Sequence, residues 1–342
     1  MSRRALTLLL ASLLAVGLAV AGASSTVPYV ALTPGPAYDT LGAVGGAPVL
    51  SITGHQVYKT DGALDLTTVS VRDKISLLEA LQGWLSSSEA VVPREILFPP
   101  DQTQEQTDQE NTQQMQQSQD AATTAALHEL GLPSTTTVVV ADVTKGAPAD
   151  GKLEDGDVLR TVDGVAVKDM AALRALISRH QPGESVVIGY TRDGRPGTVT
   201  VGTVASTDPQ PRPLIGIVPQ EHSTFPVKVD ITLKDVGGPS AGLMFALGIL
   251  EKLGPESLTG GRHIAGTGEI TADGKVGAIG GIAEKMRGAR AVGATVFLAP
   301  ADNCAEAKAS KPAGLTLARV STLKDALAAL ATLRAGGTPR GC

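Results

Sequence analysis

The sequence predicts an α+β protein that carries an apolar segment at its N-terminus, and three features predict it. Residues 5–23 contain no charge and follow Arg3 and Arg4. Short stretches of alternating apolar residues, such as 225–233, recur between turns rich in Gly and Pro, as in β-strands. Residues 243–250 are apolar on every side, as in a helix buried in a core. With 342 residues, the chain is long enough for two domains.

The composition excludes several classes of partner. The net charge is −5 and no long basic run occurs, so nucleic acid is not expected. The 2 cysteines and 5 histidines show no metal-ligand spacing, so we expect no metal and no cofactor. The sequence has no phosphate-binding pattern G-x-x-x-x-G-K-[ST], so we expect no use of ATP and substrates that arrive already extended.

Residues 1–25 are interpreted as a signal peptide or a membrane anchor. The apolar run 5–23 is long enough to span a bilayer, and the two arginines before it would keep the N-terminus inside. The sequence Ala-Gly-Ala at 21–23 could instead be a cleavage site of a secreted protein. We favour the single-pass anchor. Both alternatives place the rest of the chain outside the cytoplasm, where Cys304 and Cys342 could form a disulfide.

The region 26–126 is predicted to hold strands, a helix and a glutamine-rich segment. The strands and the helix are expected at 27–32, 49–52, 64–71 and 75–85. The turn 33–36 should end the first strand. Trp84 is expected to pack in the core, with an exposed binding role as the alternative. Segment 101–120 has nine glutamines and favours a flexible linker. Residues 115–130 contain no Gly or Pro and could form a helix that ends at Gly131.

The next region carries a recognisable pattern. The sequence Gly-Ala-Pro-Ala at 146–149 precedes Leu-Glu-Asp-Gly-Asp-Val-Leu-Arg-Thr-Val-Asp-Gly at 153–164. A helix predicted at 169–180 and strands predicted at 185–191 and 198–204 complete the pattern. Over residues 127–206 the chain resembles a PDZ domain of the bacterial protease-associated kind, a small β-barrel-like sandwich capped by helices.

The PDZ resemblance implies a peptide-binding site. Such domains add an extended chain end to a sheet edge, and loop N–H groups bind its carboxylate. Gly131 and Leu132 would form this loop, and Val138 and Val139 would lie on the edge strand. The alternative is a rigid spacer that binds no peptide.

A serine lies at the predicted start of the buried helix. Residues 238–242 read Gly-Pro-Ser-Ala-Gly, which predicts a helix with Gly238 as N-cap and Pro239 at the first helical position. Ser240 would lie in the first turn, where free backbone N–H groups and the positive helix end favour an oxyanion. By itself, the pattern also fits a serine beside an ordinary helix start.

A lysine lies on the apolar face of another predicted helix. Gly281 opens this helix, which should run to about Val292. Lys285 falls on the same face as Ile282 and Met286, whereas Glu284 and Arg287 point the other way. Burial lowers the pKa of a lysine, and a neutral lysine can act as a base for a serine nucleophile. A lysine whose amine reaches water is the alternative.

Three motifs in order resemble the proteolytic domain of Lon-type serine peptidases over residues 214–333. They are Gly-Pro-Ser-Ala-Gly, Gly-Thr-Gly-Glu-Ile-Thr at 266–271 and Gly-Gly-Ile-Ala-Glu-Lys at 280–285. The resemblance implies that Ser240 is the nucleophile and Lys285 its base. It places Thr267 near the amine, with Gly238, Pro239 and Ala241 in supporting roles. Many Lon enzymes have an acid before this first motif, where this chain has Gly237.

The resemblances together predict the domain layout. Residues 26–126 are similar to the first half of a Lon proteolytic domain, 127–206 form an inserted PDZ domain, 207–335 complete the proteolytic domain, and 336–342 are a tail. Lon domains form rings, which implies a homo-oligomer.

We expect an ATP-independent Ser–Lys endopeptidase that acts on extracytoplasmic proteins or peptides, with a PDZ domain that binds or gates their C-termini. The alternatives are a non-catalytic peptide-binding or chaperone-like protein and a self-processing protease. A Ser-His-Asp triad with His222 or His263 is the competing catalytic arrangement.

Overall fold

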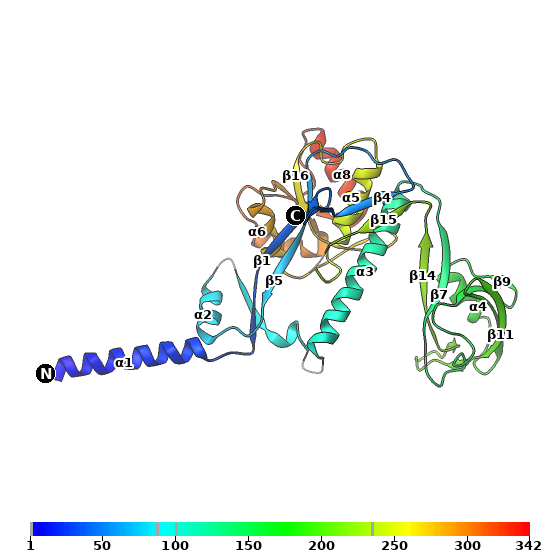
Figure 1. The fold of residues 1–342 in the computed structure, drawn as a ribbon, viewed down its shortest axis with the longest axis horizontal. Helices are drawn as coiled ribbons and strands as arrows, with labels where there is room; N and C mark the ends of the chain where they lie inside the picture. Colours follow the sequence, from blue (N-terminus) through cyan, green and yellow to red (C-terminus); the bar gives the residue numbers. More distant parts are fainter. Residues whose placement is uncertain (1–2, 87–88, 100–101, 234–235) are drawn as a thin grey trace. The chain divides into compact units, whose positions relative to one another are not determined.

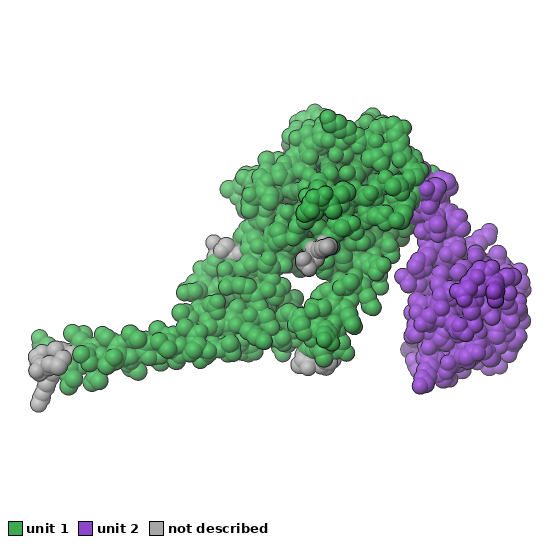
Figure 2. Space-filling view, viewed as in Figure 1, with its two compact units in different colours: residues 1–131, 227–342 green, residues 132–226 purple. Residues whose placement is uncertain are grey.

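The computed structural model describes residues 3–86, 89–99, 102–233 and 236–342. The chain forms two compact units (Figure 2). Unit 1 combines residues 1–131 with 227–342, and unit 2 consists of residues 132–226. The middle of the chain is therefore inserted into the first unit.

A long helix, α1 (Arg3–Ser24), begins unit 1. Residues 6–24 of α1 have a mean hydropathy of 2.3 and none of this stretch is buried. Within the described residues, α1 is the one helix long and apolar enough to cross a membrane by length and composition.

The core of unit 1 is a mixed sheet of six strands in the order β20-β19-β16-β5-β1-β6 (Figure 1). The strands are β1 (Tyr29–Asp39), β5 (Ala63–Arg72), β6 (Ala90–Pro93), β16 (His263–Gly266), β19 (Val296–Pro300) and β20 (Thr316–Val320). The four strands from β20 to β5 run parallel, whereas β1 is antiparallel to both its neighbours. Because β5 precedes the insertion and pairs with β16 after it, neither half can form this sheet alone.

Helices cover both faces of this sheet. The two that matter for the site are α5 (Gly242–Leu253) and α6 (Ile282–Ala291). Successive residues of a strand point to opposite faces. Ala265 of β16 packs in the cluster with Ile282 of α6, and a Cβ on Gly266 would lie 2.7 Å from Met244 of α5. The two helices therefore lie on opposite faces of β16.

The remaining elements of unit 1 support this arrangement. They are β2 (Ala43–Val44), β3 (Ala47–Pro48), β4 (Leu50–Thr53), α2 (Leu77–Leu85), η1 (Arg94–Ile96), α3 (Gln104–Glu129), β15 (Lys228–Ile231), β17 (Glu269–Ile270), β18 (Val276–Gly277), η2 (Ala301–Asn303), α7 (Cys304–Ala309) and α8 (Leu323–Arg334). The first turn of α7 is joined to the C-terminus by the disulfide Cys304–Cys342. Cys342 packs against the core beneath α6, so the bond fixes the tail to that core.

Three expectations for the N-terminal half are wrong. The first strand continues through residues 33–36 as a bulge of β1 and ends at Asp39. The glutamine-rich segment is helical from Gln104, because Thr103 and Gln106 form a capping box and one side of α3 packs on α5. Trp84 is 52% exposed, because α2 turns its small residues inward.

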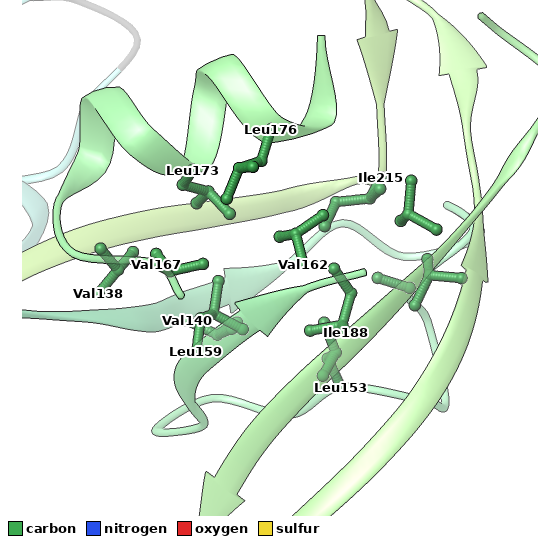
Figure 3. Close-up of a cluster of buried hydrophobic side chains, with 13 residues drawn as sticks. Val138, Val140, Leu153, Leu159, Val162, Val167, Leu173, Leu176, Ile188 and Ile215 are labelled. Atoms are coloured by element: carbon green, nitrogen blue, oxygen red, sulfur yellow. The ribbon is translucent and has the colours of Figure 1, made fainter. Parts of the chain in front are cut away.

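Unit 2 is built on its own sheet, which is antiparallel throughout, with one helix packed against it. Its elements are β7 (Thr135–Val143), β8 (Val158–Val162), β9 (Val165–Ala166), α4 (Met170–Ile177), β10 (Ser185–Arg192), β11 (Arg195–Gly202), β12 (Val204–Ala205), β13 (Pro213–Leu214) and β14 (Ile217–Thr224). The strand order is β11-β10-β8-β7-β14, with β9 paired to β8. Leu173 and Leu176 of α4 meet Val138, Leu159 and Ile188 in its core (Figure 3).

Unit 2 extends further along the chain than the expected boundary at 206. Residues 217–224 form β14, which pairs with β7 along its whole length, from Ile217 opposite Val143 to Thr224 opposite Thr135. The sequence predicts no strand in this segment and places it in the proteolytic domain. The return to unit 1 occurs at residue 227, immediately before β15 pairs with β4.

Candidate active site

Ser240 lies in a turn before α5 and not within the helix. The helix begins at Gly242 with Ala241 as N-cap, so the expected helix start at Pro239 is wrong. Long-range contacts hold the preceding residues outside the helix. The N–H of Gly238, where φ is +81°, donates to the carbonyl of Asn111 at 3.0 Å. The hydroxyl of Ser118, also on α3, donates to the carbonyl of Pro239 at 2.8 Å.

The end of β16 fixes the backbone of Ser240. The N–H of Gly268 donates to the carbonyl of Ser240 at 2.9 Å, and the hydroxyl of Thr267 donates to the same oxygen at 3.0 Å. Gly268 adopts a φ of +157°, and a Cβ there would lie 2.8 Å from Val276. This close approach lets the chain after β16 reach the serine.

Lys285 reaches the serine from the other face of the sheet. Gly281 starts α6 with a φ of +68°, which suits glycine, and a Cβ there would lie 2.7 Å from Val69. The Nζ of Lys285 lies 2.8 Å from the Oγ of Ser240 and 3.2 Å from the Oγ1 of Thr267. Thr267 is fully buried and Lys285 is 3% exposed. The structure thus brings together the three residues that the motifs singled out.

Burial makes this lysine unusually acidic. Desolvation lowers the pKa of Lys285 to about 8, while the charge of nearby Glu269 opposes the shift. Thr267 donates its only hydroxyl proton to a carbonyl, so towards Lys285 it can only accept. A neutral amine that donates to Thr267 can direct its lone pair at the hydroxyl of Ser240. The arrangement can therefore remove a proton from a serine.

The expected faces of α6 are partly wrong. Glu284 does not point away from the core but is 4% exposed, and Arg287 forms an ion pair with it at 3.2 Å. The helix, expected to run to about Val292, ends at Ala291, and Val292 is 41% exposed. A buried carboxylate can lie on this face because a cation neutralises it.

A groove with a volume of about 640 Å³ opens beside the serine and the lysine. Its walls come from β1, β5, β17, the turn before α5 and the turn before α6, and include Leu32, Tyr38, Val69, Val71, Glu269 and Ile279. β16 pairs with β5 only from Ala63 to Leu66. In the described part of the chain, no strand continues this pairing, so residues 67–71 present a free strand edge to the groove.

The histidine alternative lacks support within the described residues. His263 hydrogen-bonds with Asp65, and burial raises the pKa of that aspartate. However, His263 lies at the start of β16. The serine contacts the segment beyond the other end of that strand, through Thr267 and Gly268. His222 lies on β14 of unit 2. No hydrogen bond between described residues joins either histidine to Ser240.

The structure contradicts the expected PDZ peptide site. Gly131, with a φ of +68°, ends α3, and its N–H donates to the carbonyl of His128. Leu132 follows directly as the first residue of unit 2. Val138 is completely buried, and both Val138 and Val139 lie on β7, which pairs with β8 on one side and β14 on the other. At Val138 and Val139, β7 therefore has no free edge, and the sheet ends at β14 instead.

The residues of α3 that hold the serine turn were not among the predicted site residues. Ser118 lies on the buried side of α3 with Met115, Ala122 and Ala125. A polar residue within that helical stripe was the available signal, because buried hydroxyl groups normally find a partner. Its partner, the carbonyl of Pro239, lies 121 residues away in the sequence.

Comparison with known proteins gives matches to both regions. Residues 219–331 match the family model of the Lon protease (S16) C-terminal proteolytic domain, and residues 108–203 match that of the PDZ domain. Lon protease 1 of Bacillus subtilis is 36% identical over 91 residues, which are 26% of this chain and 12% of that protein. Lon protease 1 of Sorangium cellulosum is 41% identical over 100 residues, or 28% of this chain and 12% of that protein.

The chain therefore spans only 12% of the length of these two curated relatives. Among solved structures, the PDZ domain of an SdrC-like protein from Listeria monocytogenes is 28% identical, with a TM-score of 0.23. That match covers 24% of this chain and 85% of the Listeria domain. The two family models account for separate regions, and the motifs with Ser240, Thr267 and Lys285 all lie within the second. This chain combines a PDZ domain with a proteolytic domain of the Lon serine-peptidase type.

Proposed function

We propose that the chain is a Ser–Lys endopeptidase that cleaves extended protein or peptide segments without ATP. Neutral Lys285 takes the proton from Ser240 as its Oγ attacks the carbonyl carbon of the scissile bond. Lys285 then gives that proton to the leaving nitrogen, which leaves an acyl-enzyme. Water then attacks the acyl carbon while Lys285 accepts a proton from it. Lys285 returns this proton to the Oγ of Ser240 as the ester bond breaks, which releases the carboxylic acid product and restores the free enzyme.

The tetrahedral intermediate needs donors for its oxyanion. The N–H of Gly238 is occupied by Asn111, and Pro239 has no N–H. Among the hydrogen bonds of the described residues, none uses the N–H of Ser240 or Ala241. These two amides border the groove and precede the positive end of α5, so they are the donors we assign.

The groove suits an extended substrate. The free edge of β5 at residues 67–71 can pair with a substrate strand, which would hold its backbone beside Ser240. Groove residues such as Leu32, Val69 and Ile279 favour apolar side chains around the cleaved bond. The apolar helix α1 and the disulfide support a site outside the cytoplasm, with the chain anchored in the membrane.

The observation that carries this proposal is a buried lysine amine 2.8 Å from a serine hydroxyl. The test is digestion of an unfolded protein by the full chain, followed by mass spectrometry. Ser240→Ala and Lys285→Arg should both abolish cleavage, since a guanidinium remains protonated. Lys308→Arg on the exposed face of α7 is the matched control and should retain activity. Full activity of Lys285→Arg would refute the proposed base.

We also propose that unit 2 binds peptide ends along β14. Its outer edge is free in the described chain, and Glu221 on this strand accepts a hydrogen bond from the N–H of Met170 at the start of α4. The turn before β14, with Gly216 at a φ of +81°, replaces Gly131 as the candidate carboxylate loop. The N–H groups of Thr144 and Ala149 donate to the carbonyls of Gly216 and Ile215 in this turn. Because these carbonyls are bound within unit 2, the N–H groups of the turn can face a ligand.

Amide chemical shifts of the labelled protein test this second proposal. Peptides with a free C-terminus should shift the amides of residues 215–224 more than those of 135–143. Amidated peptides should bind more weakly, because the charge that the loop would bind is gone. Equal binding of free and amidated peptides across a library would contradict it.

A further inference from the structure

The helix α2 carries its apolar residues on the outside. Five large apolar side chains, which we call the α2 apolar face, are between 40% and 90% exposed: Leu77, Leu78, Leu81, Trp84 and Leu85. At 100° per residue they occupy an arc of about 120°. The opposite side of α2 carries the small residues Ala80 and Gly83, which are buried. A helix on the surface of a soluble domain normally shows the reverse orientation.

Close packing fixes this orientation. A Cβ on Gly83 would lie 2.4 Å from the side chain of Val91 on β6, and Ala80 packs with Ala31 and Ile75. The capping box between Ser76 and Glu79 also holds the first turn. Rotating the α2 apolar face inward would bring leucines where only a glycine fits, so the face stays exposed within the chain. Exposed apolar patches of this kind mark interaction surfaces.

The position of α2 next to α1 identifies the partner. The N–H of Leu77 donates to the carbonyl of Ser25 at 2.9 Å, and Thr26 pairs with Ser76. The helix α2 therefore begins against the residues that immediately follow α1, the helix able to cross a membrane. If α1 crosses a bilayer, α2 lies where it emerges.

The chemistry of this surface fits the boundary between lipid headgroups and acyl chains. The ring of Trp84 packs edge-on against Tyr29, with centroids 5.3 Å apart. Trp84 is the single tryptophan of the chain, and Trp and Tyr favour membrane interfaces because they join an apolar ring to a polar group. Exposed Lys74 lies just before the helix, and Ile96, in η1 directly after β6, is a further exposed apolar residue.

We propose that the α2 apolar face is embedded in the surface of the bilayer that α1 crosses, so that unit 1 is held against the membrane at two points. The inference rests on the proposed role of α1 as an anchor. It adds a lipid-binding surface within the proteolytic unit, whose β1 continues from Tyr29 to groove residues Leu32 and Pro36.

Tryptophan fluorescence of the full chain in lipid vesicles tests the proposal, because emission reports Trp84 alone. The vesicles contain phosphatidylcholine with or without brominated acyl chains, and flotation measures association with them separately. We expect flotation, loss of emission in brominated vesicles and protection from aqueous iodide. The double variant Leu78→Ser/Leu81→Ser should float but lose both the quenching by lipid and the protection. Val165→Ser, which changes a residue 47% exposed in unit 2, is the matched control and should behave as the parent.

Three other results would overturn the proposal. If iodide quenches the emission of Trp84 and brominated lipid does not, the α2 apolar face lies in water. Protection from iodide without quenching by lipid, together with a larger particle mass, would show a face that binds a second copy. Failure to float would remove the anchor and the proposal with it. Cleavage of a soluble unfolded protein by the double variant should remain at the parent's level, so these outcomes are independent of the Ser–Lys chemistry.

Discussion

Replacing Lys285 with methionine should change the pH dependence of stability as well as abolish cleavage. Methionine keeps a similar volume and removes the amine. In the folded protein the pKa of Lys285 is about 8, against an ordinary value of 10.5. Below pH 8 the lysine is protonated in both the folded and unfolded states, and its burial then destabilises the fold. A shift of about 2.5 units corresponds to about 3.4 kcal/mol.

The sign follows from proton binding. Between pH 8 and 10.5 the folded lysine has lost its proton while the unfolded lysine retains it, so stability rises with pH. From pH 7 to pH 10 the free energy of unfolding of the parent should therefore increase by about 2.5 kcal/mol relative to Lys285→Met. Comparing the free energies of unfolding at two pH values cancels the contributions of hydrogen bonds and packing, which are the same at both.

Urea unfolding followed by Trp84 emission is the appropriate assay, since Trp84 belongs to unit 1 and does not report unit 2. Lys308→Met removes an exposed lysine from α7 and controls for the change in charge. A constant stability difference between parent and Lys285→Met over this pH range would refute the lowered pKa. It would also weaken the assignment of Lys285 as a base, whatever the activity of the variant.

Three further changes test the surroundings of the site. Glu269→Gln removes the charge that raises the pKa of Lys285, so the rising limb of the pH–rate profile should move to lower pH; an unmoved limb contradicts this. Replacing both cysteines, which are 38 residues apart, with serine should lower the free energy of unfolding by about 4 kcal/mol, measured against the parent with and without reductant. Gly281→Ala should impair folding and cleavage because of its positive φ and the clash with β5, whereas Gly280→Ala, with open space around it, should be tolerated in the same thermal-unfolding and peptidase assays.

Much of the site could be predicted from the sequence, because the residues that indicate each part of it lie close together in the chain. The helical spacing around Lys285 predicted a buried amine, and the structure places it at 3% exposure. The expected helix start at Pro239 was wrong because the carbonyl of Asn111 and the hydroxyl of Ser118 on α3 hold Gly238 and Pro239 outside the helix, and no local rule includes such distant groups. The strand β14 was missed because Pro219 and the charged Glu221 are typical of loops, yet an edge strand accepts both. For α2, the periodicity of the sequence predicts one apolar face and one face of small residues. Only the packing of Val91 against Gly83 shows that the small residues point inward.

Unit 2 is inserted between two segments of the chain that lead to the turn with Ser240. The chain enters unit 2 directly after α3, the helix whose Asn111 and Ser118 hold the turn at Gly238 and Pro239. It leaves unit 2 directly before β15, from which it continues to that same turn. Both connections therefore lead to elements that position Ser240. A peptide on β14 could alter cleavage only by binding more tightly to one of two states of this turn. Comparing kcat and KM with and without such a peptide, in the parent and in Ser118→Ala, would reveal that coupling, because the variant loosens the turn without touching either ligand.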